Sequence, residues 1–191
     1  MKKTATGFLL IAFLSGCAMQ GTKIYSLHLR PEAPAHHKIH DATVAVVVTS
    51  PRYLSQPYIV YRNSSYNLDI SRYAKWQAPP DDMLRDALKD LLANTLFKEV
   101  RTPGIPQEGV YGLNINLRHF ERWDEGDASY AKVAFETTFL SPQGKLLFQH
   151  SFERITRLED RRFASLAKSL SDSLDAGTDE LKEKITKFMN L

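Results

Sequence analysis

Cys17 carries the most reactive side chain of this protein, and it is the only cysteine in the 191-residue chain. A single cysteine excludes an intramolecular disulfide, a Cys-x-x-Cys redox pair and a multi-cysteine zinc site. It lies in the stretch LLIAFLSGCAMQ, from Leu9 to Gln20, where no His or acidic residue is present to activate a catalytic thiol. The role that remains for its sulfur is covalent attachment.

The residues before Cys17 have the three-part pattern of a secretory signal. Met1 to Lys3 form a short positive region, Thr4 to Leu14 form an apolar stretch, and the small residues Ser15 and Gly16 follow. The apolar stretch is shorter than the roughly 20 residues that cross a bilayer as a helix. We therefore expect residues 1–16 to be a signal peptide that is removed.

The sequence Leu14-Ser15-Gly16-Cys17 resembles the bacterial lipobox. The resemblance implies cleavage between Gly16 and Cys17, a diacylglyceryl group on the sulfur and an acyl chain on the new amino terminus. Two or three such chains make membrane attachment effectively permanent. An ordinary secretion signal and a hydrophobic N-terminal helix are the alternatives. Ala18, in place of Asp, resembles a signal for the outer membrane.

The charge of the chain gives little support to nucleic-acid binding. Its formal net charge is +3, and removal of Lys2 and Lys3 with the signal leaves 23 basic against 22 acidic residues. No run of Lys and Arg remains that could neutralise a phosphate backbone.

The sequence also lacks the common motifs of enzymes. It contains no P-loop, no Gly-x-Gly-x-x-Gly, no Gly-x-Ser-x-Gly and no His-Glu-x-x-His. We expect no catalytic residues and no cofactor other than the lipid on Cys17. A periplasmic hydrolase without a recognisable motif is the enzyme alternative.

Two groups of residues could be taken for metal sites, and the sequence favours a simpler interpretation of each. The first contains three histidines in the proline-containing stretch Arg30 to Asp41, which has the composition of a loop. The second is WDEGD, which lacks the spacing of an EF-hand loop and is predicted to be a solvated hairpin tip. The first group is His36, His37 and His40, and the second is Trp123, Asp124, Glu125 and Asp127.

The N-terminal half of the mature chain predicts strands followed by a helix. Residues 17–23 form a lipidated N-terminus and short tether, and residues 24–191 form one periplasmic domain. Alternation predicts a strand over 24–29, a β-branched run predicts a strand over 43–50, and residues 56–70 predict a β-hairpin. Pro79, Pro80 and two aspartates then begin a helix that ends near Phe97.

The C-terminal half predicts three strands and a long helix. The strands, near 111–120, 130–140 and 145–155, are joined as an antiparallel meander, with a turn at Ser141 to Gly144. An apolar stripe from Phe163 to Phe188 predicts a helix that covers the sheet, and the alternative is that part of this stripe meets another protein. The fold class is therefore α+β, an antiparallel-rich β-sheet covered by two α-helices as a two-layer sandwich.

The stretch from Pro51 to Pro80 is the best candidate for a partner-binding surface. It is rich in Tyr, Arg and Trp, whose side chains give rigid, amphipathic contact area. A hairpin pinned onto the core by Tyr73 and Trp76 is the structural interpretation, and the two can hold together. The candidate partner-binding residues are Tyr53, Tyr58, Tyr61, Arg62, Tyr73 and Trp76.

In this stretch the sequence resembles the ABC-type transport auxiliary lipoproteins, the PqiC-like (YmbA-like) family. The resemblance rests on the order of the lipobox, Tyr25-Ser26-Leu27, a Val-rich strand, Ile59-Val60-Tyr61-Arg62 and Trp76-x-x-Pro79. It covers essentially the whole mature chain. Many members have Asp-Arg where this chain has Ser55-Gln56.

The resemblance implies a non-enzymatic adaptor, anchored in the outer membrane by its lipid, that docks an MCE-domain periplasmic protein. Such systems move lipids between the two membranes and maintain envelope integrity. Self-association into a homo-oligomeric ring would suit this docking. The alternative is a stand-alone outer-membrane lipoprotein that binds lipid or assists envelope assembly.

Overall fold

The computed structural model describes residues 21–30, 40–103 and 105–189. The expected signal peptide, Cys17, Ala18, His36 and His37 lie outside these residues. No helix within the described ranges is long and apolar enough to cross a membrane.

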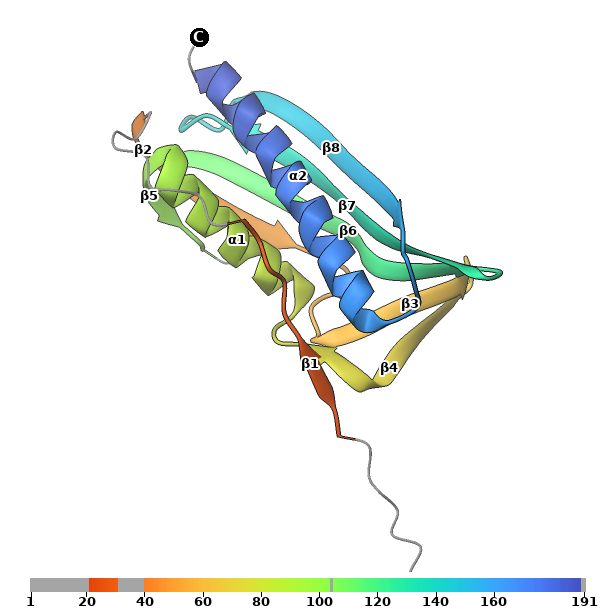
Figure 1. Ribbon diagram of the computed structural model, residues 1–191. Coiled ribbons are helices and arrows are strands. Elements are labelled where there is room, and N and C mark those ends of the chain that lie inside the picture. Colours follow the sequence, from red (N-terminus) through yellow and green to blue (C-terminus); the bar gives the residue numbers. More distant parts are fainter. Residues whose placement is uncertain (1–20, 31–39, 104, 190–191) are drawn as a thin grey trace, which may run out of the picture.

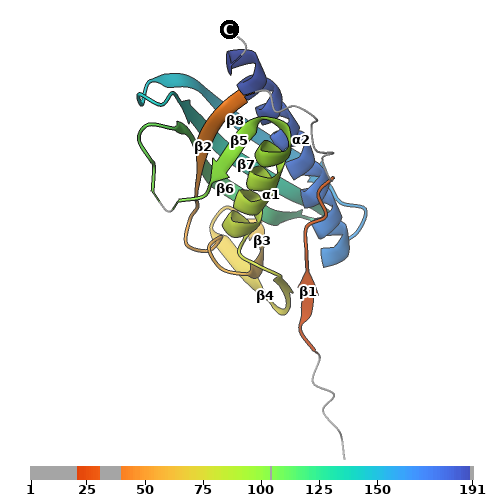
Figure 2. The ribbon, with the colours of Figure 1, turned by 90° about the vertical axis from the view of Figure 1, so that its left-hand side faces the viewer.

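The described residues form one eight-stranded mixed sheet with both helices on the same face (Figures 1 and 2). This confirms the predicted α+β class. In chain order the elements are β1 (Lys23–Tyr25), β2 (His40–Thr49), β3 (Tyr58–Ser64), β4 (Asn67–Trp76), α1 (Pro80–Thr95), β5 (Phe97–Arg101), β6 (Tyr111–Glu125), β7 (Ala128–Leu140), β8 (Leu146–Arg157) and α2 (Phe163–Met189).

Strand β6 is the centre of the sheet. Along one side it pairs antiparallel with β7, which pairs antiparallel with β8, so the predicted meander is confirmed. Its other side is shared: residues 111–116 pair parallel with β2, and Arg122 and Trp123 pair parallel with β3. Strand β5 lies beyond β2, and β4 and β1 lie beyond β3, so the sheet forks at β6.

The antiparallel expectation holds for the β3–β4 hairpin and for β6 to β8. The pairings β1–β4, β2–β5, β2–β6 and β3–β6 are parallel. Periodicity reveals which residues share a face but not the direction of the neighbouring strand, so these pairings were not predicted.

Helix α1 begins and packs as the sequence predicts. Pro80 lies in its first turn with Asp81 and Asp82, at the positive end of the helix dipole. Its buried face includes Leu84 and Leu88, and it packs on β2 and β5. The chain leaves α1 at Thr95 and enters β5 almost at once, a strand that the sequence analysis did not predict.

Helix α2 covers β7 and β8, which confirms the structural interpretation of its apolar stripe. Leu170, Leu174 and Leu181 are fully buried. Gly177 lies so close to the sheet that a Cβ atom there would be 2.9 Å from the Phe152 ring and 3.0 Å from the Phe135 ring.

The N-terminal segment departs from its prediction after Tyr25. A strand was expected over 24–29, but β1 ends at Tyr25, and the chain then runs between α1 and α2 (Figure 1). There the His28 amide donates to Ser171 Oγ (3.0 Å) and the Arg30 amide donates to Asp175 Oδ1 (3.1 Å). Side chains of α2, rather than a neighbouring strand, therefore satisfy this backbone.

Candidate partner-binding surface

The six predicted partner-binding residues lie on the β3–β4 hairpin and the loop before it, but they do not form one surface. Alternation along β3 places Tyr61 on the helix-covered face and Arg62 on the opposite, helix-free face. Tyr58 shares the phase of Arg62, and its ring lies 5.9 Å from Lys75 Nζ. Tyr53 comes from the loop between β2 and β3, and its ring lies 5.6 Å from the Arg62 guanidinium.

The two remaining residues differ in exposure. Trp76 is 2% exposed and its ring lies 5.4 Å from that of Phe120, so it pins the hairpin onto the core. Tyr73 is 52% exposed, so it does not share this pinning role.

A buried carboxylate organises the helix-free face at the junction of β3 and β6. Glu121 Oε2 accepts a hydrogen bond from Arg62 Nε at 2.9 Å, and Glu121 Oε1 lies 2.8 Å from His119 Nδ1. The Tyr53 hydroxyl donates to the Arg118 carbonyl at 3.2 Å. The Glu121 side chain is 0% exposed, whereas that of Arg62 is 17% exposed. We call Tyr53, Arg62, His119 and Glu121 the Glu121 cluster.

Glu121 and Arg62 remain charged at neutral pH. Burial alone would raise the pKa of Glu121, but the hydrogen bonds from His119 and Arg62 outweigh burial and hold this pKa below its ordinary value. Burial raises the pKa of Tyr53, and the charge of Glu121 raises it further. Burial opposes the charge of Arg62, yet its bond to Glu121 raises its pKa. The face therefore presents a fixed guanidinium held by a buried carboxylate.

An aromatic hollow adjoins this cluster on the same face. It has a volume of about 430 Å³ and is lined by Trp123, Glu125, Tyr130, Lys132 and Ile155. Trp123 pairs with Arg62 of β3, and Lys132 pairs with Glu121, so the hollow and the cluster are continuous. Aromatic side chains next to arginine are typical of protein interfaces.

Sequence reasoning missed Glu121 and His119 because β6 is irregular. The alternation of Leu113, Ile115 and Leu117 breaks at a register shift between Leu117 and His119. After this shift Phe120 points into the core and Glu121 points to the helix-free face. Only the contact with β3, far away in the sequence, reveals the role of Glu121.

The acidic stretch WDEGD ends β6 and forms the β6–β7 turn, as predicted, but Asp124 is 14% exposed rather than solvated. Gly126 takes a positive φ of 56° at the turn. Asp124 is paired: its Oδ2 accepts from Arg122 Nη2 at 2.8 Å, and its Oδ1 accepts from the Ser129 hydroxyl. No cluster of three or more potential metal-ligating side chains is found within the described ranges.

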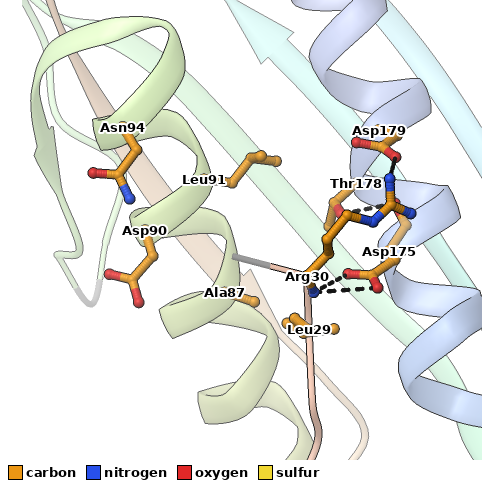
Figure 3. Close-up of a pocket in the computed structure, with 9 residues that line it drawn as sticks. All are labelled: Leu29, Arg30, Ala87, Asp90, Leu91, Asn94, Asp175, Thr178 and Asp179. Atoms are coloured by element: carbon orange, nitrogen blue, oxygen red, sulfur yellow. Dashed lines mark hydrogen bonds and ion pairs between the residues drawn. The ribbon is translucent and has the colours of Figure 1, made fainter. Parts of the chain in front are cut away.

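A second pocket lies between the helices, where the N-terminal segment passes (Figure 3). Its volume is about 260 Å³, and polar side chains such as Asp90, Asn94 and Asp175 line it together with Leu29. The Arg30 side chain lies on the α2 side of the pocket, with Nη1 3.9 Å from Asp179 Oδ2. A lipid-carrying cavity would be mostly apolar, so this lining gives the carrier alternative no support.

Comparison with known proteins connects this fold to a family. A family model described as "ABC-type transport auxiliary lipoprotein component" matches residues 25–182. The crystal structure of protein XCC0632 from Xanthomonas campestris, a DUF330 protein, has a TM-score of 0.70 at 20% identity, covering 83% of this chain and 92% of its own. The crystal structure of an uncharacterized protein has a TM-score of 0.66 at 20% identity, covering 86% and 99%. No curated protein matches the chain.

Proposed function

The chain belongs to the family of ABC-type transport auxiliary lipoprotein components, and from this membership we propose that it is a lipid-anchored periplasmic adaptor of an MCE-type intermembrane lipid transport system. The observation that carries the proposal is the family match over residues 25–182. The family is an auxiliary component of transport rather than a known class of enzyme, and we propose a non-enzymatic role.

The anchor is the lipid on Cys17. Acyl chains there hold the protein in a membrane without a transmembrane segment. Ala18 directs it to the outer membrane, so that the domain faces the periplasm.

The helix-free face is the docking surface for the MCE-domain protein. The Glu121 cluster supplies a fixed guanidinium, and the adjoining hollow supplies Trp123 and Tyr130. These side chains are rigid, so little conformational entropy is lost when a partner covers them. Neither α1 nor α2 lies on this face, so neither would have to move (Figure 2).

Photo-crosslinking in intact envelopes tests the docking surface. A photoreactive residue at Tyr130 or Ile155, on the helix-free face, is expected to capture the MCE protein, whereas one at exposed Lys89 on α1 is not. Arg62 is a poor position for the probe, because its replacement leaves the buried Glu121 without its main partner. Absence of the MCE protein from the crosslinks at both positions of the hollow would contradict the proposal.

Two substitutions test the anchor separately. Cys17→Ser is expected to abolish the acyl mass and release the domain from membranes. Ala18→Asp is expected to keep the acyl mass and to move the protein to the inner membrane fraction. A Cys17→Ser protein that still carries its full acyl mass would show that the lipid is attached elsewhere.

A further inference from the structure

Four of the eight large hydrophobic side chains that are exposed among the described residues lie on or next to β1 and β4. Among the described residues, Ile24, Tyr66, Ile70 and Tyr73 are large, hydrophobic and exposed, and all four lie on β1, on β4 or at the turn before β4. In Figure 1, β1 and the end of β4 that pairs with it lie at the end of the molecule opposite the C-terminus.

A basic hollow lies beside these side chains. Arg72, Arg122 and Arg161 line it with Tyr61 and Phe163, and its volume is about 460 Å³. We call these five residues the arginine pocket. No carboxylate lines it.

Two of the three arginines keep an uncompensated charge. Arg122 stacks between the rings of Tyr61 (4.9 Å) and Phe163 (5.2 Å) and is paired with Asp124. Arg161 donates to the Gly126 carbonyl, which carries no net charge. Arg72 is exposed and has no ion pair among the described residues. The pocket therefore suits an anion such as a phosphate, which arginine binds in a bidentate manner.

The short tether brings this end close to the bilayer. Six residue steps separate Cys17 from Lys23, the first residue of β1, and they span at most about 20 Å. Helix α2 has 27 residues and is therefore about 40 Å long. The arginine pocket lies at its first residue, and the β7–β8 end of the sheet lies at its last turn, where the rings of Phe148 and Phe188 are 5.1 Å apart.

We propose that the surface formed by β1, β4 and the arginine pocket rests on the membrane that holds the anchor, with an anionic phospholipid headgroup in the pocket. The inference rests on the proposed lipidation of Cys17. Membrane–water interfaces favour tyrosine at the level of the headgroups and arginine near anionic lipids. The contact fixes the orientation of the domain and directs the far end of α2 into the periplasm.

Single-cysteine labelling tests the orientation, because acylation leaves no other free thiol in the chain. The full-length acylated protein is reconstituted in vesicles of phosphatidylethanolamine and phosphatidylglycerol that contain a headgroup nitroxide lipid. A fluorophore at Tyr73→Cys is compared with one at Leu146→Cys, a matched control, since the two side chains are 52% and 48% exposed at opposite ends. We expect strong quenching at position 73 and little at position 146.

Charge neutralisation tests the pocket. An arginine near an anionic leaflet is worth a factor of about five in binding, so Arg72→Gln with Arg161→Gln is expected to lower the ratio of docked to undocked protein about 25-fold. Lys89→Gln with Lys187→Gln removes the same charge elsewhere and is expected to change little. If the double arginine variant fails to fold, Arg72→Gln alone is expected to lower the ratio about fivefold.

The outcomes separate this proposal from the adaptor role. Equal quenching at both positions in acylated protein would overturn membrane docking and leave the crosslinking result intact. Absence of the acyl mass would remove the tether on which the inference rests. Tight binding of inorganic phosphate without vesicles, combined with unchanged quenching in Arg72→Gln, would make the pocket a site for a soluble anion and overturn the proposal.

Discussion

Replacing Arg62 by Met should destabilise the protein far more than an ordinary surface substitution. The Glu121 side chain is 0% exposed, and after the change only His119 remains within hydrogen-bond distance of its carboxylate. Removing one partner of a buried ion pair typically costs 3–5 kcal/mol. Because Arg62 is partly exposed and His119 still contacts Glu121, we expect a cost of about 3 kcal/mol at pH 7.

The loss of unfolding free energy caused by Arg62→Met should become smaller as the pH falls. In the native protein the pKa of Glu121 is below its ordinary value, so its contribution to stability is present above pH 4.5 and is lost as the pH falls through the folded-state pKa. Without Arg62 burial dominates and raises this pKa, so the variant recovers relative stability when Glu121 binds a proton. The difference in unfolding free energy between the native protein and the variant should therefore be smaller at pH 4 than at pH 7.

Urea unfolding of the mature protein in non-ionic detergent, followed by tryptophan fluorescence, measures both values. The matched control is Arg118→Met on β6. Its ion pair with Glu136 is long, at 3.7 Å, and about half exposed on both sides, so a cost of at most about 1 kcal/mol is expected. If Arg62→Met costs no more than this control, or if its cost is the same at pH 7 and pH 4, the account of the Glu121 cluster is wrong.

Two further predictions concern the packing of α2 and the pKa of Asp160, just before this helix. Gly177→Ala should lower the free energy of unfolding by about 1 kcal/mol, because overpacking against the Phe152 ring, 2.9 Å from the new Cβ, outweighs the gain in helix propensity. Urea unfolding measures the change, and a stabilised variant would contradict it. In an NMR titration the Asp160 carboxyl should show a pKa of about 2, since the Arg162 side chain and then the Ser165 hydroxyl donate to it. The stability that these bonds give is present above pH 4 and is lost as the pH falls toward 2, so a midpoint near 4 would refute it.

Local patterns predicted the elements that local interactions create. The helices and the β6–β7–β8 meander follow from apolar spacing and turn residues within each segment. Strand β5 was missed because it is five residues long and follows α1 almost directly, so neither a turn nor a long alternation marks it. The path after Tyr25 was missed because its partners, Ser171 and Asp175, lie about 145 residues away.

Local patterns predicted only part of the candidate surface, because some of its contacts join segments that are far apart in the sequence. The composition of the β3–β4 stretch pointed to Arg62 and the tyrosines beside it. Alternation places Tyr61 and Arg62 on opposite faces of their strand, but it could not show which of these faces the helices cover, or that Glu121 is the partner of Arg62, 59 residues away. The register shift after Leu117 changes the phase of β6 in a way that the alternation of the sequence conceals.

The parallel pairing of β1 with β4 matters for mechanical load. If the lipid anchor and a docked partner pull on the domain from opposite ends, the tension enters the chain at β1. Its three residues pair with Ala74, Lys75 and Trp76, and the hydrogen bonds of the ladder run across the strand axis. A pull along β1 therefore loads these bonds together, in shear, rather than opening them one at a time. The short strand at the membrane end acts as a mechanical clamp between the anchor and the core.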